Sequence, residues 1–333
     1  MYTDITGRGK SYALDSVDRA GGIGVIDLCY AILRRLLHYE CREQNIMSGF
    51  ETRRLSHALG AEVLGVDLSQ DLDQKSTNDI RNLWDENLVL LFRDQHISPA
   101  NHLDFTRHFG EPTQLESSHG VDGFPEILRV TNKLIDGKLS NTRNTGRNWH
   151  SDQTWHHSPA FGSILRCLEN PDIGGDTMFT NLYLAYETLS PKLKDIIDGM
   201  EAVHDFALVA GLAARDPEYV AEMMRLHPPV VHKCVQVNSR TGRKALYLGD
   251  RVRHFVGMTE EESKPLLQLY VQHATRLEFT YRHVWRVGDL IMWQNRCTMH
   301  LALPDFDYTQ PRDMQRTTIL GDTIGQLWMP EAA

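Results

Sequence analysis

The chain has 333 residues, of which 41% are hydrophobic and 24% charged, as is ordinary for a globular protein that buries a substantial core. Its net charge of −9 argues against nucleic acid as a general partner, and no apolar run approaches the length of about 18 residues that a membrane-spanning helix needs. The five cysteines are scattered and lack C-x-x-C spacing, which predicts reduced thiols in a cytoplasmic protein rather than disulfides or a zinc site.

The N-terminal segment carries no clear structural signal. Residues 23–37 are apolar enough for a short helix, but Arg34 and Arg35 interrupt them and no clear cleavage site follows, so we expect no signal peptide. Met47 suits a true start. We therefore predict that residues 1–46 are an N-terminal extension that is either not native or dispensable, and that residues 47–333 form a single domain.

Helices are predicted where apolar residues recur at helical spacing or where a cap or an early proline marks a helix start. These stretches are residues 71–91, 98–109, 191–200, 217–226 and 259–274. In the last one, Thr259 is the expected cap and Glu262 completes a capping box. Pro265 leaves a later start at Ser263 open.

Short apolar strands separated by turns make up much of the remaining chain. They are predicted at residues 63–66, 88–92, 127–130, 163–168, 245–248, 278–285, 290–293 and 317–320. Many short strands with helices packed outside are typical of a jelly roll. The predicted fold class is therefore mainly β with flanking helices, arranged as a double-stranded β-helix.

The triplet His150-Ser151-Asp152, with His300 far downstream, points to metal chemistry. Residues i and i+2 of a strand face the same side, so His150 and Asp152 can converge on one ion while Ser151 points away. His300 could approach from a distant strand folded back beside them. Two histidines and one carboxylate can hold a non-haem Fe(II) and leave its opposite face open. A hydrogen-bonded His–Asp pair is the alternative.

A second H-x-D triplet, His102-Leu103-Asp104, shows why this spacing alone is weak evidence for a metal site. It lies in the predicted helix that Ser98 caps, where residues i and i+2 diverge by about 200°. We therefore interpret His102 and Asp104 as ordinary surface or half-buried residues.

Three further residues suit an anionic cosubstrate. Arg312 and Arg316 precede the last predicted strand, and a guanidinium pairs bidentately with a carboxylate. Thr177 follows the turn at Gly174 and Gly175 and could offer its hydroxyl. Taken alone, the arginines could equally form surface salt bridges, and Thr177 could be a β-branched residue after a turn.

Together these pieces resemble the taurine dioxygenase / 2,4-dichlorophenoxyacetate dioxygenase family of Fe(II)- and 2-oxoglutarate-dependent oxygenases. The likeness is carried in family order by Asn148–Asp152, Gly174–Thr177, Gly288–His300 and Arg312–Asp322, and it spans residues 55–322.

The resemblance implies a role for each of these residues. His150, Asp152 and His300 would bind Fe(II), while Thr177 and Arg312 would hold the distal carboxylate of 2-oxoglutarate. Arg316 matches a position that contacts the anionic group of the substrate or of the cosubstrate. O2 and a small, anionic organic substrate would be the other partners, and a homo-oligomer is compatible with the family. Hydroxylation of the substrate, with cleavage where the new hydroxyl makes it unstable, would yield succinate and CO2.

Two departures argue against taurine as the substrate. Members acting on taurine have a histidine shortly after the stretch matching His108–Glu111, whereas this chain has none before His119. Gln153 replaces the valine that follows the aspartate in the taurine enzyme. The segments 273–283 and 288–293 look more like the branch that degrades aryloxyalkanoates.

Two other classes compete with an oxygenase. A catalytically silent or regulatory jelly-roll metal-binding protein would keep the barrel without turnover, and a cupin-like hydrolase or isomerase would need no 2-oxoglutarate. The latter leaves Arg312 and Arg316 unexplained. If His150 and His300 bind iron, they must be neutral, so we expect metal affinity to fall as the pH drops through the histidine titration range.

Overall fold

The structure is a computed structural model that describes residues 49–114, 120–135, 137–140, 146–209, 211–212 and 216–329. The predicted extension at residues 1–46 lies outside these residues, so its interpretation stays a prediction. Within the described part, no helix is long and apolar enough to cross a membrane. The three described cysteines are buried free thiols, at Cys167, Cys234 and Cys297.

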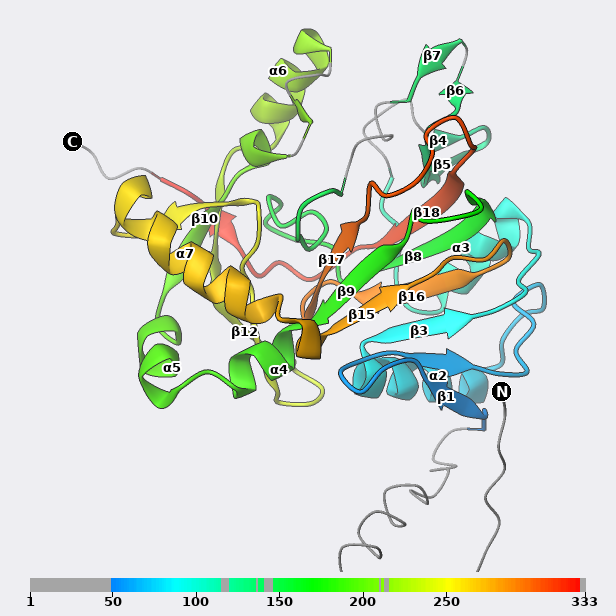
Figure 1. Cartoon of the computed structure of the whole chain (residues 1–333), viewed down its shortest axis with the longest axis horizontal. Helices are drawn as coiled ribbons and strands as arrows, with labels where there is room; N and C mark the ends of the chain where they lie inside the picture. The colour runs from blue at the N-terminus through cyan, green and yellow to red at the C-terminus, as the bar shows by residue number, and fades with distance from the viewer. Residues whose placement is uncertain are drawn as a thin grey trace, which may run out of the picture. The chain divides into compact units, whose positions relative to one another are not determined.

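One eight-stranded sheet forms the main layer of the domain (Figure 1). In spatial order its strands are β1 (Thr52–Arg54), β2 (Ala61–Val63), β3 (Val89–Phe92), β16 (Leu290–Gln294), β8 (Gly162–Glu169), β18 (Asp313–Ile319), β5 (Phe124–Thr131) and β4 (Gly120–Val121). Strands far apart in the sequence therefore lie side by side in its centre, where β16 pairs antiparallel with both β3 and β8.

The central strands are buried on both faces, which explains their continuous apolar sequences. In β3, Leu90 and Phe92 pack on one face with Trp84 of α2 (Gln74–Asn87) and Phe105 of α3 (Pro99–Arg107). Val89 and Leu91 belong to a different cluster on the other face. The alternation follows from the two-residue period of a strand.

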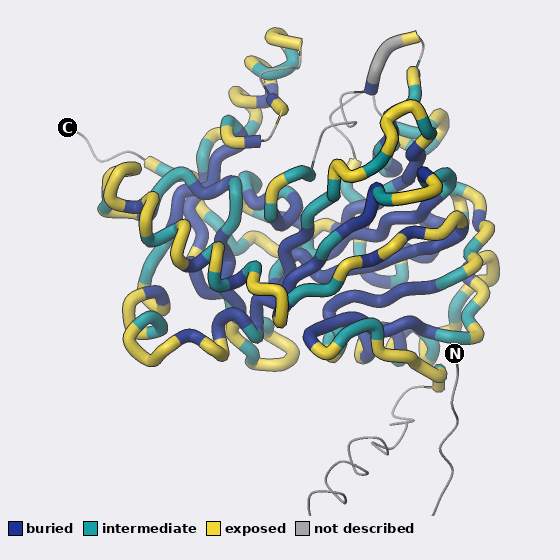
Figure 2. Tube along the Cα trace, in the orientation of Figure 1, coloured by how far each residue is buried: buried dark blue, intermediate teal, exposed yellow. Residues whose placement is uncertain are grey.

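The inner face of this sheet packs against a three-stranded sheet, β15 (Thr280–His283), β9 (Thr177–Asn181) and β17 (Thr298–Ala302). Phe179 of β9 lies in the same buried cluster as Leu91, Ile291 and Trp293 of the main sheet. Figure 2 shows the buried strands of both layers. The two layers form the predicted jelly roll, and the candidate site lies between them.

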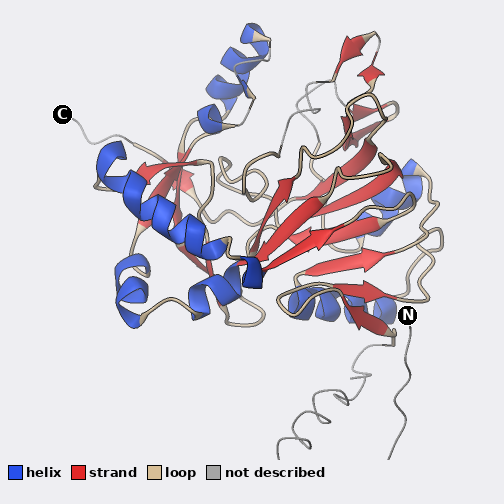
Figure 3. Ribbon diagram, viewed as in Figure 1, coloured by secondary structure: helices blue, strands red, loops and turns tan. Residues whose placement is uncertain are grey.

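Many of the remaining helices and strands, which Figure 3 shows, contribute to a third buried cluster, to which Tyr183, Phe255 and Tyr270 belong. The strands are β14 (Val252–Phe255), β10 (Glu201–His204), β11 (Val230–Lys233) and β19 (Gln326–Leu327) in one sheet, and the pairs β12 (Val235–Val237) with β13 (Lys244–Leu246) and β6 (Leu134–Ile135) with β7 (Lys138–Leu139). The helices are α4 (Leu182–Glu187), α5 (Pro191–Ile197), α6 (Pro217–Leu226) and α7 (Glu260–Ala274), with the 3-10 turns η1 (Phe206–Leu208) and η3 (Leu277–Phe279).

Most predicted elements are confirmed. α7 begins directly after Thr259, whose side chain accepts a hydrogen bond from the backbone N–H of Glu262. The earlier of the two predicted starts is therefore confirmed. The strand predicted at residues 63–66 is displaced to Ala61–Val63, because Gly65 adopts φ +74 and takes the chain out of the sheet.

The second H-x-D triplet lies in α3 as predicted, and its two polar side chains diverge. The side chain of Asp104 is 63% exposed and pairs with Arg107. His102 is fully buried, with Nε2 3.3 Å from Oγ1 of Thr317. The prediction of a surface or half-buried residue was therefore wrong for His102.

Candidate active site

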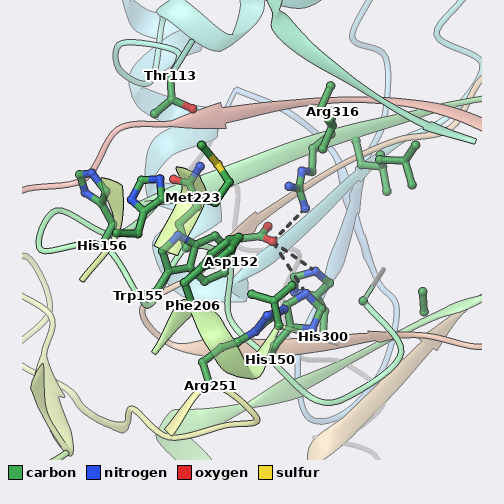
Figure 4. Close-up of a pocket in the computed structure, with 18 of the residues that line it drawn as sticks. Thr113, His150, Asp152, Trp155, His156, Phe206, Met223, Arg251, His300 and Arg316 are labelled. Carbon is green, nitrogen blue, oxygen red and sulfur yellow. Dashed lines mark hydrogen bonds and ion pairs between the residues drawn. The ribbon is translucent and has the colours of Figure 1, made fainter. Parts of the chain in front are cut away.

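All six predicted site residues line one cavity of ≈ 320 Å³ (Figure 4). They are His150, Asp152, Thr177, His300, Arg312 and Arg316. They come from four separate stretches of the chain, which the two sheets bring together.

The backbone holds the two histidines opposite each other. His150 and His300 form an isolated antiparallel bridge, with N–H to O distances of 3.1 and 2.8 Å. His300 lies in β17, as expected of a ligand on a distant strand. The predicted strand through Asp152 is wrong, because the bridge ends at His150 and Asp152 begins a turn in which Gln153 adopts φ +55. Ser151 does point away, donating to the carbonyl of Thr298.

The three side chains offer donor atoms that could share one metal ion. One ligand atom from each of His150, Asp152 and His300 lies within 4.8 Å of the others, and all three residues are buried. Oδ1 of Asp152 is 3.8 Å from Nε2 of His150 and 3.9 Å from Nε2 of His300. Nδ1 of His150 lies 2.7 Å from the carbonyl of Asn148, to which it can donate, leaving Nε2 for a metal. The donor set fits Fe(II).

Neighbouring groups fix the carboxylate of Asp152. Its Oδ2 accepts from the hydroxyl of Ser163 at 2.7 Å, and its Oδ1 accepts from Arg316 at 2.8 Å. Asn295 donates to Ser163 and accepts from the backbone N–H of Asp152. The role of Ser163 could not be predicted from the sequence, because Ser163 lies in the middle of an apolar strand and resembles a core position.

Burial and charge put all three side chains in the state that metal binding requires. Burial lowers the pKa of His150 to about 3, assisted by the charges of His300 and Arg251. Burial likewise lowers the pKa of His300 to about 4. Burial alone would raise the pKa of Asp152, but Arg316 and the two histidines hold it well below its usual range. Near neutral pH the site therefore has two neutral imidazoles and one carboxylate.

Thr177 and Arg312 form the cationic end of the cavity. Nε of Arg312 donates to the carbonyl of Gly175 at 3.1 Å, and the hydroxyl of Thr177 accepts from the indole N–H of Trp285 at 3.0 Å. Accepting this bond leaves the Thr177 hydroxyl hydrogen able to donate to a ligand. Both residues are buried, and burial lowers the pKa of Arg312 to about 10, so it stays charged.

The tight turn at Gly174 and Gly175 explains how Arg312 reaches this position. A Cβ on Gly174 would lie 2.1 Å from the carbonyl oxygen of Asp305, and one on Gly175 would lie 3.2 Å from Cδ and Nε of Arg312. Both glycines also have positive φ values, +80 and +70. Only glycine lets the turn approach Arg312 and Asp305 so closely.

The other end of the cavity is largely apolar and was not predicted. Its walls include Trp155, Phe206, Tyr219 and Met223, together with the cationic side chain of Arg251. Tyr219 and Met223 come from α6, and Phe206 comes from η1. These residues belong to no recognisable sequence motif, and they come together only in the folded chain.

Comparison with known proteins agrees with this site. Residues 51–318 match the model of the family described as taurine catabolism dioxygenase TauD, TfdA family. The chain is 33% identical over 275 residues to the alpha-ketoglutarate-dependent 2,4-dichlorophenoxyacetate dioxygenase of Cupriavidus pinatubonensis, covering 79% of this chain and 95% of that protein. It is 32% identical to an alpha-ketoglutarate-dependent sulfate ester dioxygenase of Pseudomonas putida, covering 79% and 87%.

Solved structures show the same architecture. A complex of AAD-2 with Mn(II) and N-oxalylglycine aligns with a TM-score of 0.74 and 30% identity, covering 83% of this chain and 99% of that one. A taurine dioxygenase from Burkholderia xenovorans aligns with a TM-score of 0.69 and 36% identity, covering 82% and 91%. The chain belongs to the TauD/TfdA family of Fe(II)- and 2-oxoglutarate-dependent dioxygenases.

Proposed function

We propose that His150, Asp152 and His300 bind the catalytic Fe(II), and that the enzyme hydroxylates a small anionic organic substrate. The single observation that carries this proposal is the meeting of these three buried donors within 4.8 Å, in a cavity that also contains Arg312 and Thr177. Three protein ligands leave the other coordination positions of Fe(II) for a chelating cosubstrate and O2.

Thr177 and Arg312 are proposed to hold the distal carboxylate of 2-oxoglutarate. The guanidinium is fixed through Gly175 and the hydroxyl through Trp285, so both donors are positioned before the ligand arrives. Such preorganisation reduces the entropy cost of binding. A carboxylate entering a buried cationic pocket also offsets the cost of burying Arg312.

The protein positions the substrate and the cosubstrate and excludes water, while the oxidation chemistry belongs to the metal cofactor. Fe(II) held by His150, Asp152 and His300 would supply the O2 chemistry that converts 2-oxoglutarate to succinate and CO2 and hydroxylates a substrate C–H bond. Ser163 and Arg316 hold Asp152 in one orientation throughout, and the buried histidines stay neutral. Where the hydroxylated carbon bears oxygen or sulfur, the product collapses and the substrate is cleaved.

An anionic substrate is supported by the charge of the cavity. Arg251, Arg312 and Arg316 line it, and Asp152 is the only carboxylate among the described residues of its lining. Several relatives are named for anionic substrates, such as 2,4-dichlorophenoxyacetate, (S)-phenoxypropionate and sulfate esters. The two termini of such a substrate, one charged and one apolar, match the mixed lining of the cavity.

The proposed cosubstrate site is tested by titrating Mn(II)-loaded protein with N-oxalylglycine. Arg312→Lys loses the planar fork and Thr177→Ala loses one donor, so each should weaken binding, by on the order of 10-fold or more for a charge-assisted bond. Arg243→Lys is the matched control, because Arg243 pairs with Glu187 and does not line the cavity. Unchanged affinity in both cavity variants would refute the assignment.

A further inference from the structure

Among the arginines that line the described cavity, Arg251 is the one to which the proposed iron and 2-oxoglutarate sites give no role. The other two have partners within those sites: Arg312 is held at the carbonyl of Gly175, and Arg316 donates to Oδ1 of Asp152. In Figure 4 Arg251 and Arg316 reach the metal-binding triad from opposite sides, with Arg251 beside His150. Asp250 pairs with Nε of Arg251 and offsets part of the cost of burying its charge, and Arg251 also lines the cavity, where it can meet a ligand.

The side chain of Arg251 is firmly positioned. The residue is 5% exposed, its Nε donates to Oδ1 of Asp250 at 3.1 Å, and its guanidinium lies 5.1 Å from the centre of the Trp155 ring. Trp155 itself lines the cavity. Stacking on the indole and pairing with Asp250 orient the guanidinium as a planar fork, the geometry that suits a carboxylate or sulfate.

The backbone ties this arginine to the iron site. The N–H of Asp250 donates to the carbonyl of Trp149 at 3.2 Å, one residue before the ligand His150. A Cβ on Gly249 would lie 3.2 Å from that same carbonyl oxygen and 3.6 Å from Cα of His150. The carbonyl of Arg251 accepts from Asp205, which caps η1. The distance between Arg251 and the metal ligands is therefore set by the main chain.

Apolar side chains surround the approach to Arg251. Phe206, Val209 and Met223 form a small buried cluster against which Trp155 and Tyr219 pack, and all five line the cavity. The rings of Trp155 and Phe206 meet edge to face at 5.4 Å. This part of the cavity therefore combines one cation with aromatic and thioether walls, which suits an anion joined to an apolar or aromatic body.

We propose that Arg251 is a substrate-binding residue that pairs with the anionic group of the substrate and thereby selects anions over their neutral counterparts. The inference rests on the proposed function and assigns this selection to Arg251 rather than to the family position Arg316. Trp155 is a positioning residue, because it acts by holding the guanidinium. An anion at Arg251 lies close to the iron ligand His150, so the carbon next to that anion would be the one presented for oxidation.

The test compares two pairs of probes on protein loaded with Mn(II) and N-oxalylglycine, which does not turn over. The pairs are 2,4-dichlorophenoxyacetate with 2-(2,4-dichlorophenoxy)ethanol, and hexyl sulfate with hexanol. Calorimetric dissociation constants are measured for the wild type, Arg251→Met, Arg251→Lys and Arg253→Met. The last is the matched control, since Arg253 lies in β14, pairs with Asp205 and does not line the cavity.

The wild type should bind at least one anion more tightly than its neutral partner, by on the order of 10- to 100-fold for a charge-assisted pair. Arg251→Met should abolish that preference, Arg251→Lys should retain part of it, and Arg253→Met should keep it. Unchanged N-oxalylglycine affinity in Arg251→Met shows that the site is folded. A preference that survives in Arg251→Met, or none in the wild type, overturns the proposal.

The same titrations separate this inference from the proposed function. If the wild type fails to bind N-oxalylglycine, the 2-oxoglutarate assignment fails, and the anion preference is then read on protein loaded with Mn(II) alone. Arg316→Met is titrated as a further variant: if it loses the preference while Arg251→Met keeps it, Arg316 carries the selection and the role of Arg251 is refuted.

Discussion

At the residue scale, burial decides how the metal site responds to pH. The sequence alone predicts that iron affinity falls through the ordinary histidine range near pH 6.5. In the folded protein the pKa of His150 is lowered to about 3 and that of His300 to about 4. A lowered pKa means that both rings are already neutral at moderately acid pH, so protons compete with iron only at lower pH.

We therefore predict that metal affinity is nearly constant from about pH 8 to about pH 6 and declines only below about pH 5. Competitive Mn(II) titrations across this range measure it directly. A steady loss between about pH 7.5 and about pH 6 would contradict the burial that the structure gives these histidines.

The same residues show what a sequence can and cannot predict. The six predicted site residues could be found from the sequence because their residue types and spacing are distinctive, and in the structure they line one cavity. Ser163 and Arg251 could not be found in this way. Ser163 occupies an ordinary inward position in β8, and Arg251 is placed by a backbone hydrogen bond between its neighbour Asp250 and Trp149. Such long-range contacts leave no local pattern.

At the element scale, the turn before β9 contacts Arg312, the proposed cosubstrate-binding residue. Gly175 has φ +70, and a Cβ there would press on the side chain of Arg312. Gly65 has φ +74, but nothing lies within 4 Å of the position that a Cβ would take, so it offers the same backbone strain without the contact.

We predict that Gly175→Ala and Gly65→Ala each lose about 1 kcal/mol of stability, because alanine is strained in the left-handed region. Gly175→Ala alone should also weaken N-oxalylglycine binding, since Arg312 must move. Urea unfolding and ligand titration measure the two effects. Equal ligand affinity in both variants would show that the turn does not control Arg312.

Elements with a strong periodic or capping signal were predicted well, and those defined by pairing were not. α3 and α7 have the predicted caps at Ser98 and Thr259. By contrast, β10 and β14 are short and polar in part, and they become strands because they pair with each other. The strand predicted through Asp152 does not form, because within the described part of the chain no strand pairs with the residues that directly follow His150.

At the scale of the whole molecule, the family match begins at residue 51, and residues 1–46 remain a predicted extension. We expect a chain of residues 47–333 to fold and to bind N-oxalylglycine with unchanged affinity. Thermal unfolding and titration of the two lengths test this. Loss of folding or binding in the shorter chain would show that the extension is an integral part of the enzyme.

The jelly roll itself could be predicted in class but not in detail. Successive side chains of β3 and β16 alternate between two buried clusters, so each face of the sheet has its own core, and this accounts for the apolar runs. The order of the strands, in which β16 lies between β3 and β8, brings together parts of the chain far apart in sequence. Only family resemblance anticipates such an order.

The most direct test of the central claim is succinate formed from 2-oxoglutarate by the protein with Fe(II), ascorbate and O2. The assay uses a panel of aryloxyalkanoates, sulfate esters and sulfonates, with His150→Ala as the ligand variant and His57→Ala as an exposed histidine control. We predict that at least one anion stimulates succinate formation in the wild type and the control, and that His150→Ala abolishes it. Succinate formation that persists in His150→Ala, or its absence from the iron-loaded wild type, would contradict the assignment of this site.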